Sequence, residues 1–119
     1  MGEKIDPADH LVDLDGALRR LGGDRQLFNE FITIFLEDSP TLLEEIRSGL
    51  GSNDSAIVEK SAHSLKGLMS NFGAKQCVEL ALKIELAGRA GSVDDCGSAF
   101  TGLEAAHRQL TEELKTLQS

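Results

Sequence analysis

One histidine of this chain is placed by helical geometry in solvent, away from the core. Between about residues 53 and 72 apolar side chains recur at helical spacing, and each residue of an α-helix turns by about 100°. With Leu65 at the centre of the buried face, His63 falls about 160° away, on the opposite side. A neutral imidazole is a competent nucleophile near neutral pH, so this position favours attack on a phosphoryl group that a partner molecule presents.

Two residues one turn beyond His63 suit the same chemistry. The ammonium group of Lys66 is a compact charge that can hold phosphoryl oxygens on the outer surface of the helix. An exposed glycine within a helix costs about 1 kcal/mol relative to alanine, but it lets another molecule approach the backbone closely. Gly67 is therefore a candidate for partner access. Further polar candidates flank this surface: Lys60, Ser64 and Ser70. The residues alone leave open that His63 is an unused surface histidine.

Helices must position these side chains, because no segment shows the period-two alternation of a strand. The spacing predicts a short helix near residues 14–21 and four longer ones at about 24–50, 53–72, 74–88 and 92–117. Gly22-Gly23 and Gly73 are stop signals, and Asn53 or Asp54 is the expected N-cap of the helix at 53–72. Pro40 should kink or split the helix that contains it.

Long helices joined by short loops pack as antiparallel neighbours. We therefore expect an all-α fold, an up-down antiparallel four-helix bundle with the short N-terminal helix across one end. Residues 1–119 should form one domain, with residues 1–10 as a tail. Since there are five Phe and no Trp or Tyr, the core should be aliphatic. Residues expected on the buried face of the 53–72 helix, within about 80° of Leu65, are Ile57, Val58, Ser61, Ala62, Leu68, Met69 and Phe72.

Composition and motifs exclude several function classes. A net charge of -8 disfavours nucleic acid and anionic membranes, whose binding depends on Lys and Arg. No apolar run approaches a membrane span, so we expect a cytoplasmic protein. We also expect it to be a monomer. The three histidines are far apart, which disfavours a metal site, and His107 shares an apolar stripe and should be a packing residue. Cys77 and Cys96 lie in apolar helical patterns and should be buried thiols. No Gly-rich phosphate loop occurs, so we expect no ATP site and no autophosphorylation.

The run Ala62-His63-Ser64-Leu65-Lys66-Gly67, followed by Gly73-Ala74, resembles the signature of histidine-containing phosphotransfer (HPt) domains. The resemblance extends over nearly the whole chain, from Asp13-Leu14-Asp15 to Glu85–Gly91. It implies that His63 is the phosphoacceptor, that Lys66 lies near the phosphoryl group and that Gly67 gives a receiver domain access. A polar residue on the next helix often faces the active histidine in this family. Glu85 matches that place, although an acid does not itself favour phosphohistidine.

The resemblance implies a phosphorelay carrier without a cofactor of its own. His63 would accept a phosphoryl group from a receiver-domain aspartyl phosphate and pass it to another receiver Asp. The partners would be response-regulator receiver domains, which supply Mg²⁺, and a hybrid sensor histidine kinase. Two alternatives stay open: a phosphoacceptor domain that a separate ATP-binding kinase domain phosphorylates, and a helical interaction module whose histidine is not phosphorylated.

Overall fold

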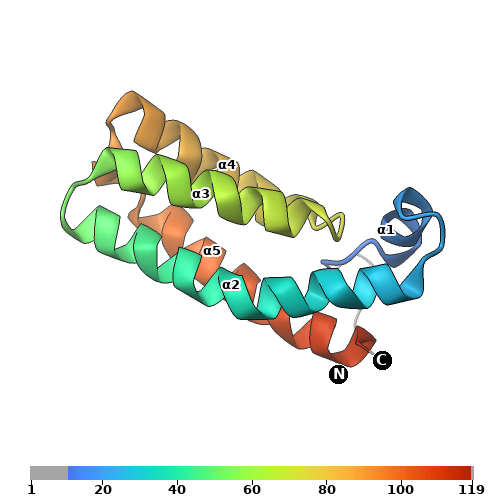
Figure 1. Cartoon of the computed structure of the whole chain (residues 1–119). Coiled ribbons are helices and arrows are strands. Elements are labelled where there is room, and N and C mark those ends of the chain that lie inside the picture. Colours follow the sequence, from blue (N-terminus) through green and yellow to red (C-terminus); the bar gives the residue numbers. More distant parts are fainter. Residues whose placement is uncertain (1–10, 119) are drawn as a thin grey trace, which may run out of the picture.

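The computed structural model describes residues 11–118, which contain helices and no strand (Figure 1). The helices are α1 (Leu14–Arg20), α2 (Arg25–Gly51), α3 (Ser55–Ser70), α4 (Lys75–Ala90) and α5 (Gly97–Leu117), with a 3-10 turn, Val93–Asp95, before α5. The predicted all-α fold class is confirmed. The predicted tail, residues 1–10, lies outside the described residues.

Local signals define most of the helix ends. Asp13, Asp24 and Asp54 are the N-caps of α1, α2 and α3, and each side chain accepts a hydrogen bond from a backbone N–H of the first turn. Asp54 is thus the N-cap of α3, while Asn53 before it has φ 57°. Gly73 follows α3 with φ 63°, a left-handed conformation that glycine adopts at low cost.

α2 matches its predicted extent closely, whereas two other helix boundaries differ from the prediction. α2 continues through Pro40 and is not split, because the loss of one hydrogen bond is tolerated in a 27-residue helix that packs against α3 and α5. α4 does not end at Gly88 but runs to Ala90, and Gly91 (φ 74°) is its left-handed cap. α5 begins at Gly97, not near Ser92, because residues 93–95 form the 3-10 turn.

The four long helices lie side by side (Figure 1). α3 contacts α2 on one side and α4 on the other, while α5 contacts α4 and α2. α1 contacts α2 and is tied to the loop after α3, where Asp13 N donates to Phe72 O at 2.9 Å. This hydrogen bond therefore ties the loop that follows α3, the helix of His63, to the start of α1.

The core lies between these helices and is not purely aliphatic. Phe28, Phe35 and Phe72 are fully buried, and the ring of Phe72 meets the other two edge-on at 5.9 and 5.7 Å. Phe100 also belongs to the core, so four of the five Phe lie in it, and the expectation of an aliphatic core is only partly correct.

The buried face of α3 agrees with the helical angles except at its edge. Val58, Ala62, Leu65 and Met69 are fully buried, whereas Ile57 is 43% exposed. Ile57 was predicted to be buried, but its angle of about 80° from Leu65 puts it at the margin of the face, where neighbouring helices do not cover it. These buried residues nevertheless fix the rotation of α3 about its axis, and with it the outward direction of His63.

Candidate functional site

His63 projects from the outer side of α3, as the helical angle predicts. Its side chain is 66% exposed, although the helix that carries it is held by a buried seam. The ring is oriented by one contact, in which Nδ1 lies 2.9 Å from Oε2 of Glu85 on α4. A rigid helix and an interhelical hydrogen bond therefore present the imidazole to solvent.

Glu85 lies beneath the histidine and is buried, with 3% of its side chain exposed. Two cations accompany the histidine on this carboxylate: Lys66 Nζ lies 2.7 Å from Oε1 and Arg89 Nη2 lies 3.0 Å from Oε2. Burial raises the pKa of the Glu85 carboxyl, but the contacts with Lys66 and His63 outweigh burial and lower the pKa below the ordinary value of 4.5. Glu85 is therefore ionised at neutral pH.

The ionised carboxylate selects one tautomer of the histidine. A carboxylate only accepts hydrogen bonds, so Nδ1 of His63 must carry the proton and donate it to Glu85. In the neutral ring Nε2 then has the lone pair. Nδ1 therefore orients the ring, and Nε2 is the ring nitrogen whose lone pair is free.

Lys66 is not the freely exposed cation that the helical angle predicts. Only 25% of its side chain is exposed, because the chain reaches over to α4 and pairs with Glu85. The prediction of an open position is therefore wrong. Lys66 neutralises the buried carboxylate of Glu85 next to His63. A pattern within α3 cannot predict this role, because Glu85 belongs to α4.

Arg89 and Glu59 belong to the same network, and sequence reasoning missed both. Besides Glu85, Arg89 contacts α3, since its Nε donates to Oε2 of Glu59 at 3.0 Å. The hydrogen bond with Glu59 raises the pKa of the Arg89 guanidinium. Glu85 and Arg89 stand four residues apart on α4, the spacing of an intrahelical ion pair, and that spacing was a signal that could have found Arg89.

Two open hollows lie beside His63, and each is lined by some of the residues predicted to belong to the site. One lies between α3 and α4; its lining residues are Ala56, Glu59, Lys60, His63, Ser64, Glu85 and Arg89. Lys60 and Ser64 are thus brought to the histidine. Ser70 is not, because it stands about 10 Å along the helix axis and its hydroxyl donates to Gly67 O at 2.8 Å.

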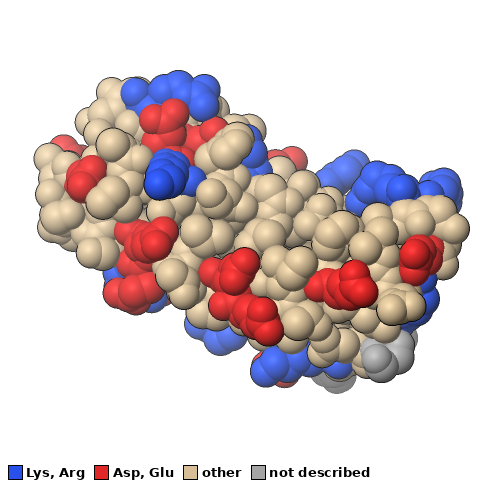
Figure 2. All heavy atoms as spheres, viewed as in Figure 1, with Lys and Arg blue, Asp and Glu red and all other residues tan. Residues whose placement is uncertain are grey.

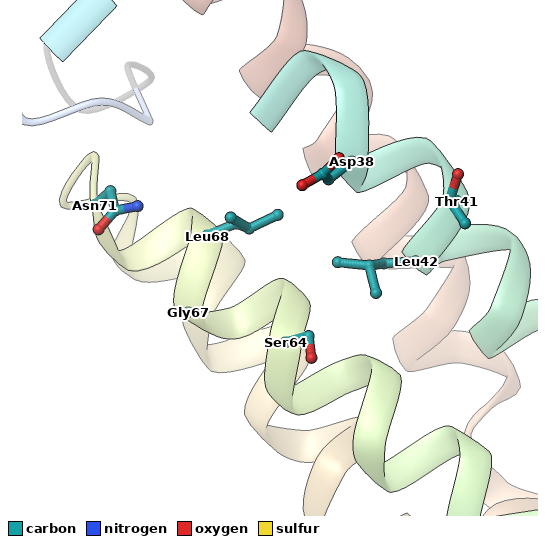
Figure 3. Close-up of a pocket in the computed structure, with 7 residues that line it drawn as sticks. All are labelled: Asp38, Thr41, Leu42, Ser64, Gly67, Leu68 and Asn71. Carbon is teal, nitrogen blue, oxygen red and sulfur yellow. The ribbon is translucent and has the colours of Figure 1, made fainter. Parts of the chain in front are cut away.

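The second hollow lies between α2 and α3 and includes Gly67 (Figure 3). Its lining residues are Asp38, Thr41, Leu42, Ser64, Gly67, Leu68 and Asn71. The side chains of Leu42 and Leu68 extend into the space between the two helices (Figure 3). A Cβ atom at Gly67 would meet nothing within 4 Å, so the glycine is not required by packing inside the chain. Its small size leaves surface beside His63 open.

The sequence matches the family described as Hpt domain over residues 30–119, which include the whole of this site. This chain belongs to the Hpt domain family. The crystal structure of histidine-containing phosphotransfer protein B (HptB) from Pseudomonas aeruginosa PAO1 is similar to it, with a TM-score of 0.82 and 22% sequence identity over 91% of this chain and 94% of that one. At this identity the likeness bears on the fold. No curated protein matches the sequence.

Membership of the family decides the class of function. Hpt domains are histidine phosphotransfer carriers of two-component phosphorelays and act with receiver domains and kinases, so this chain is such a carrier. The resemblance read from the histidine motif is confirmed.

The exposed acidic residues of α2 in this Hpt domain are Glu30, Glu37, Asp38, Glu44 and Glu45, and Figure 2 shows acidic groups distributed over the face that α2 presents.

The remaining candidates of this Hpt domain lie away from the site. His107 is a partly buried packing residue, as predicted: its Nε2 lies 2.7 Å from Ser39 Oγ and its ring contacts Phe35. Cys77 and Cys96 are buried and unpaired, as predicted, and burial raises the pKa of both thiols. Among residues 11–118 no three metal-ligating side chains gather, and no helix there is long and apolar enough to cross a membrane.

Proposed function

We propose that Nε2 of His63 is the phosphoacceptor of this Hpt domain. The phosphoryl group comes from a receiver-domain aspartyl phosphate and leaves to the Asp of another receiver. The observation that carries this proposal is the contact between His63 Nδ1 and the buried Glu85 carboxylate, 2.9 Å long. It holds the proton on Nδ1 and leaves an exposed lone pair on Nε2.

The transfer step needs no base from this chain. Nε2 attacks the phosphorus, the bond between phosphorus and the aspartyl oxygen breaks, and the receiver's carboxylate leaves with the electron pair. The ring then carries a positive charge and keeps its proton on Nδ1, beside Glu85. The carboxylate therefore stabilises the charge that develops as the new bond forms. Mg²⁺ and most of the catalytic groups belong to the receiver.

The surrounding residues have separate roles in this proposal. Lys66 keeps Glu85 ionised and, because it shares this carboxylate with His63, would attract phosphoryl oxygens once His63 is modified. Lys60, with no ion pair among the described residues, is a second cation for those oxygens, and Ser64 is a hydroxyl donor beside it. Gly67 leaves room for the receiver to approach the backbone of α3.

The finer architecture and setting are also part of the proposal. We infer an up-down antiparallel bundle of α2 to α5 with α1 across one end, because short loops join long neighbouring helices. We further propose a monomeric single domain in the cytoplasm. A hybrid sensor histidine kinase would feed the relay.

Transfer assays can separate this function from its rivals. The chain is incubated with a phosphorylated receiver and, separately, with ATP and a histidine kinase core. We expect label to enter from the receiver, to be lost in His63→Gln and to persist in the matched control His107→Gln. Label that enters only from ATP and the kinase core would favour the kinase-phosphoacceptor alternative. No label from either donor would leave an interaction module.

A further inference from the structure

α3 and α4 approach each other closely at a glycine near the site. Gly88 is buried, and a Cβ built on it would lie 2.7 Å from the backbone nitrogen of Glu59, 2.9 Å from the carbonyl oxygen of Ser55 and 3.0 Å from Cα of Glu59. All three atoms belong to the backbone of α3. Because no side chain can turn aside, any larger residue requires the two helices to separate.

The close approach occurs one turn from the carboxylate that orients His63. Glu85 precedes Gly88 by three residues, so both lie on the side of α4 that faces α3. Arg89, the next residue, binds Glu59 on α3, the residue whose backbone Gly88 nearly touches. The separation of the helices at Gly88 therefore sets how far the Glu85 carboxylate reaches toward His63.

We infer that Gly88 is a positioning residue, which holds Glu85 within hydrogen-bond distance of His63 Nδ1 by allowing α4 to touch the backbone of α3. The inference rests on the proposed role of His63. Contacts between non-bonded heavy atoms are optimal at about 3.5 Å, so an added methyl group must move α4 outward by roughly half an ångström or more. The 2.9 Å contact between His63 and Glu85 would then exceed the usual range of a hydrogen bond.

The test compares Gly88→Ala with two glycine variants at other helix contacts. Gly49→Ala also creates a tight contact, 2.9 Å from Val58 Cγ2, but between α2 and α3. Gly102→Ala meets only Leu80, at an ordinary 3.5 Å. The readouts are the melting temperature, the ¹⁵N chemical shifts of the His63 ring, which report which nitrogen has the proton, and the rate of phosphotransfer from a phosphorylated receiver.

We expect Gly88→Ala to mix the two tautomers of His63 and to slow transfer roughly three- to tenfold, because part of a charge-assisted hydrogen bond is lost. Gly49→Ala should lower the melting temperature but leave the His63 shifts unchanged. Gly102→Ala should keep or raise the melting temperature, because alanine has the higher helix propensity, and should leave the His63 shifts and the transfer rate unchanged. Wild-type shifts in a folded Gly88→Ala protein would overturn the inference. Equal changes in Gly49→Ala would also overturn it, because they would reflect general loss of stability.

A second variant decides the matter if Gly88→Ala does not fold. Glu85→Asp withdraws the carboxylate by one methylene group without crowding the helices. It should reproduce the change in tautomer and rate, and wild-type behaviour would overturn the inference. Failure of the proposed function has a different signature, because His63→Gln would then accept phosphate normally.

Discussion

The replacement of Lys66 by methionine tests the charge network beneath His63. Methionine keeps the unbranched side chain but removes the ammonium group that lies 2.7 Å from Glu85 Oε1. Glu85 is 3% exposed, so water cannot replace the lost cation. Removal of one partner from a buried ion pair costs about 3–5 kcal/mol. Here Arg89 and His63 remain on Oε2, and Lys66 is itself 25% exposed, so we expect a loss of about 1–3 kcal/mol in the free energy of unfolding.

The loss should depend on Glu85 and on pH. In a Glu85→Gln background the same Lys66→Met change should cost far less, because the buried charge is gone. The wild-type pKa of Glu85 lies below its ordinary 4.5, so its ionisation contributes stability above pH 4.5 that disappears as the pH falls through the folded-state pKa. Without Lys66 that pKa rises, so this contribution is reduced. The difference between variant and wild type should therefore be largest near pH 7 and shrink as the carboxyl becomes protonated.

Urea unfolding of the four proteins in the cycle, at pH 7 and pH 4, measures both effects. A coupling between Lys66 and Glu85 of about 1 kcal/mol or more at pH 7 is expected. An equal cost of Lys66→Met in both backgrounds would contradict the reasoning, because Lys66 would then act as a solvated side chain.

Three further predictions concern single residues. Gly67→Gln should keep or raise the melting temperature, since helix propensity improves by about 0.5–1 kcal/mol, but weaken receiver binding; unchanged affinity in titrations with a receiver would refute the access role. The pKa of His107 lies below its ordinary 6.5, mainly because the ring is buried and secondly because of the charge of Arg108. The unfolded state therefore binds more protons, and the free energy of unfolding should fall as the pH drops below 6.5. His107→Gln should flatten that slope in urea unfolding, and an unchanged slope would assign it to other groups. Burial, and then Glu113, raise the pKa of Cys77 to about 11, so alkylation at pH 8 should require unfolding, and modification of the native protein would show that the thiol is accessible.

The sequence predicted those features that depend on one helix at a time. Asp54 caps α3 through its own side chain, and the stripe around Leu65 fixes which way α3 faces. The outward position of His63 follows from these local rules. The predicted end of α4 at Gly88 was wrong for a related reason. Glycine is a common stop signal, but Gly88 lies within α4 because the backbone of α3 beside it requires a residue without a side chain.

The charge network depends on two helices and was not predictable from either. Lys66 shares a face of α3 with His63, but its partner stands 19 positions later, on α4. Glu85 was named as a candidate only through the family resemblance. Its contact with Nδ1 of His63 depends on the position of α4 along the axis of α3. Tertiary packing sets that register, and no periodicity within one helix reports it.

The central claim is tested most directly by locating the phosphoryl group on the modified chain. The protein, labelled with ¹⁵N in its histidine rings, is phosphorylated by a receiver and studied by NMR through the coupling between ³¹P and ¹⁵N. We predict coupling to Nε2 of His63, with the proton retained on Nδ1 beside Glu85. A phosphoryl group on Nδ1 of His63, or on another histidine, would contradict the account.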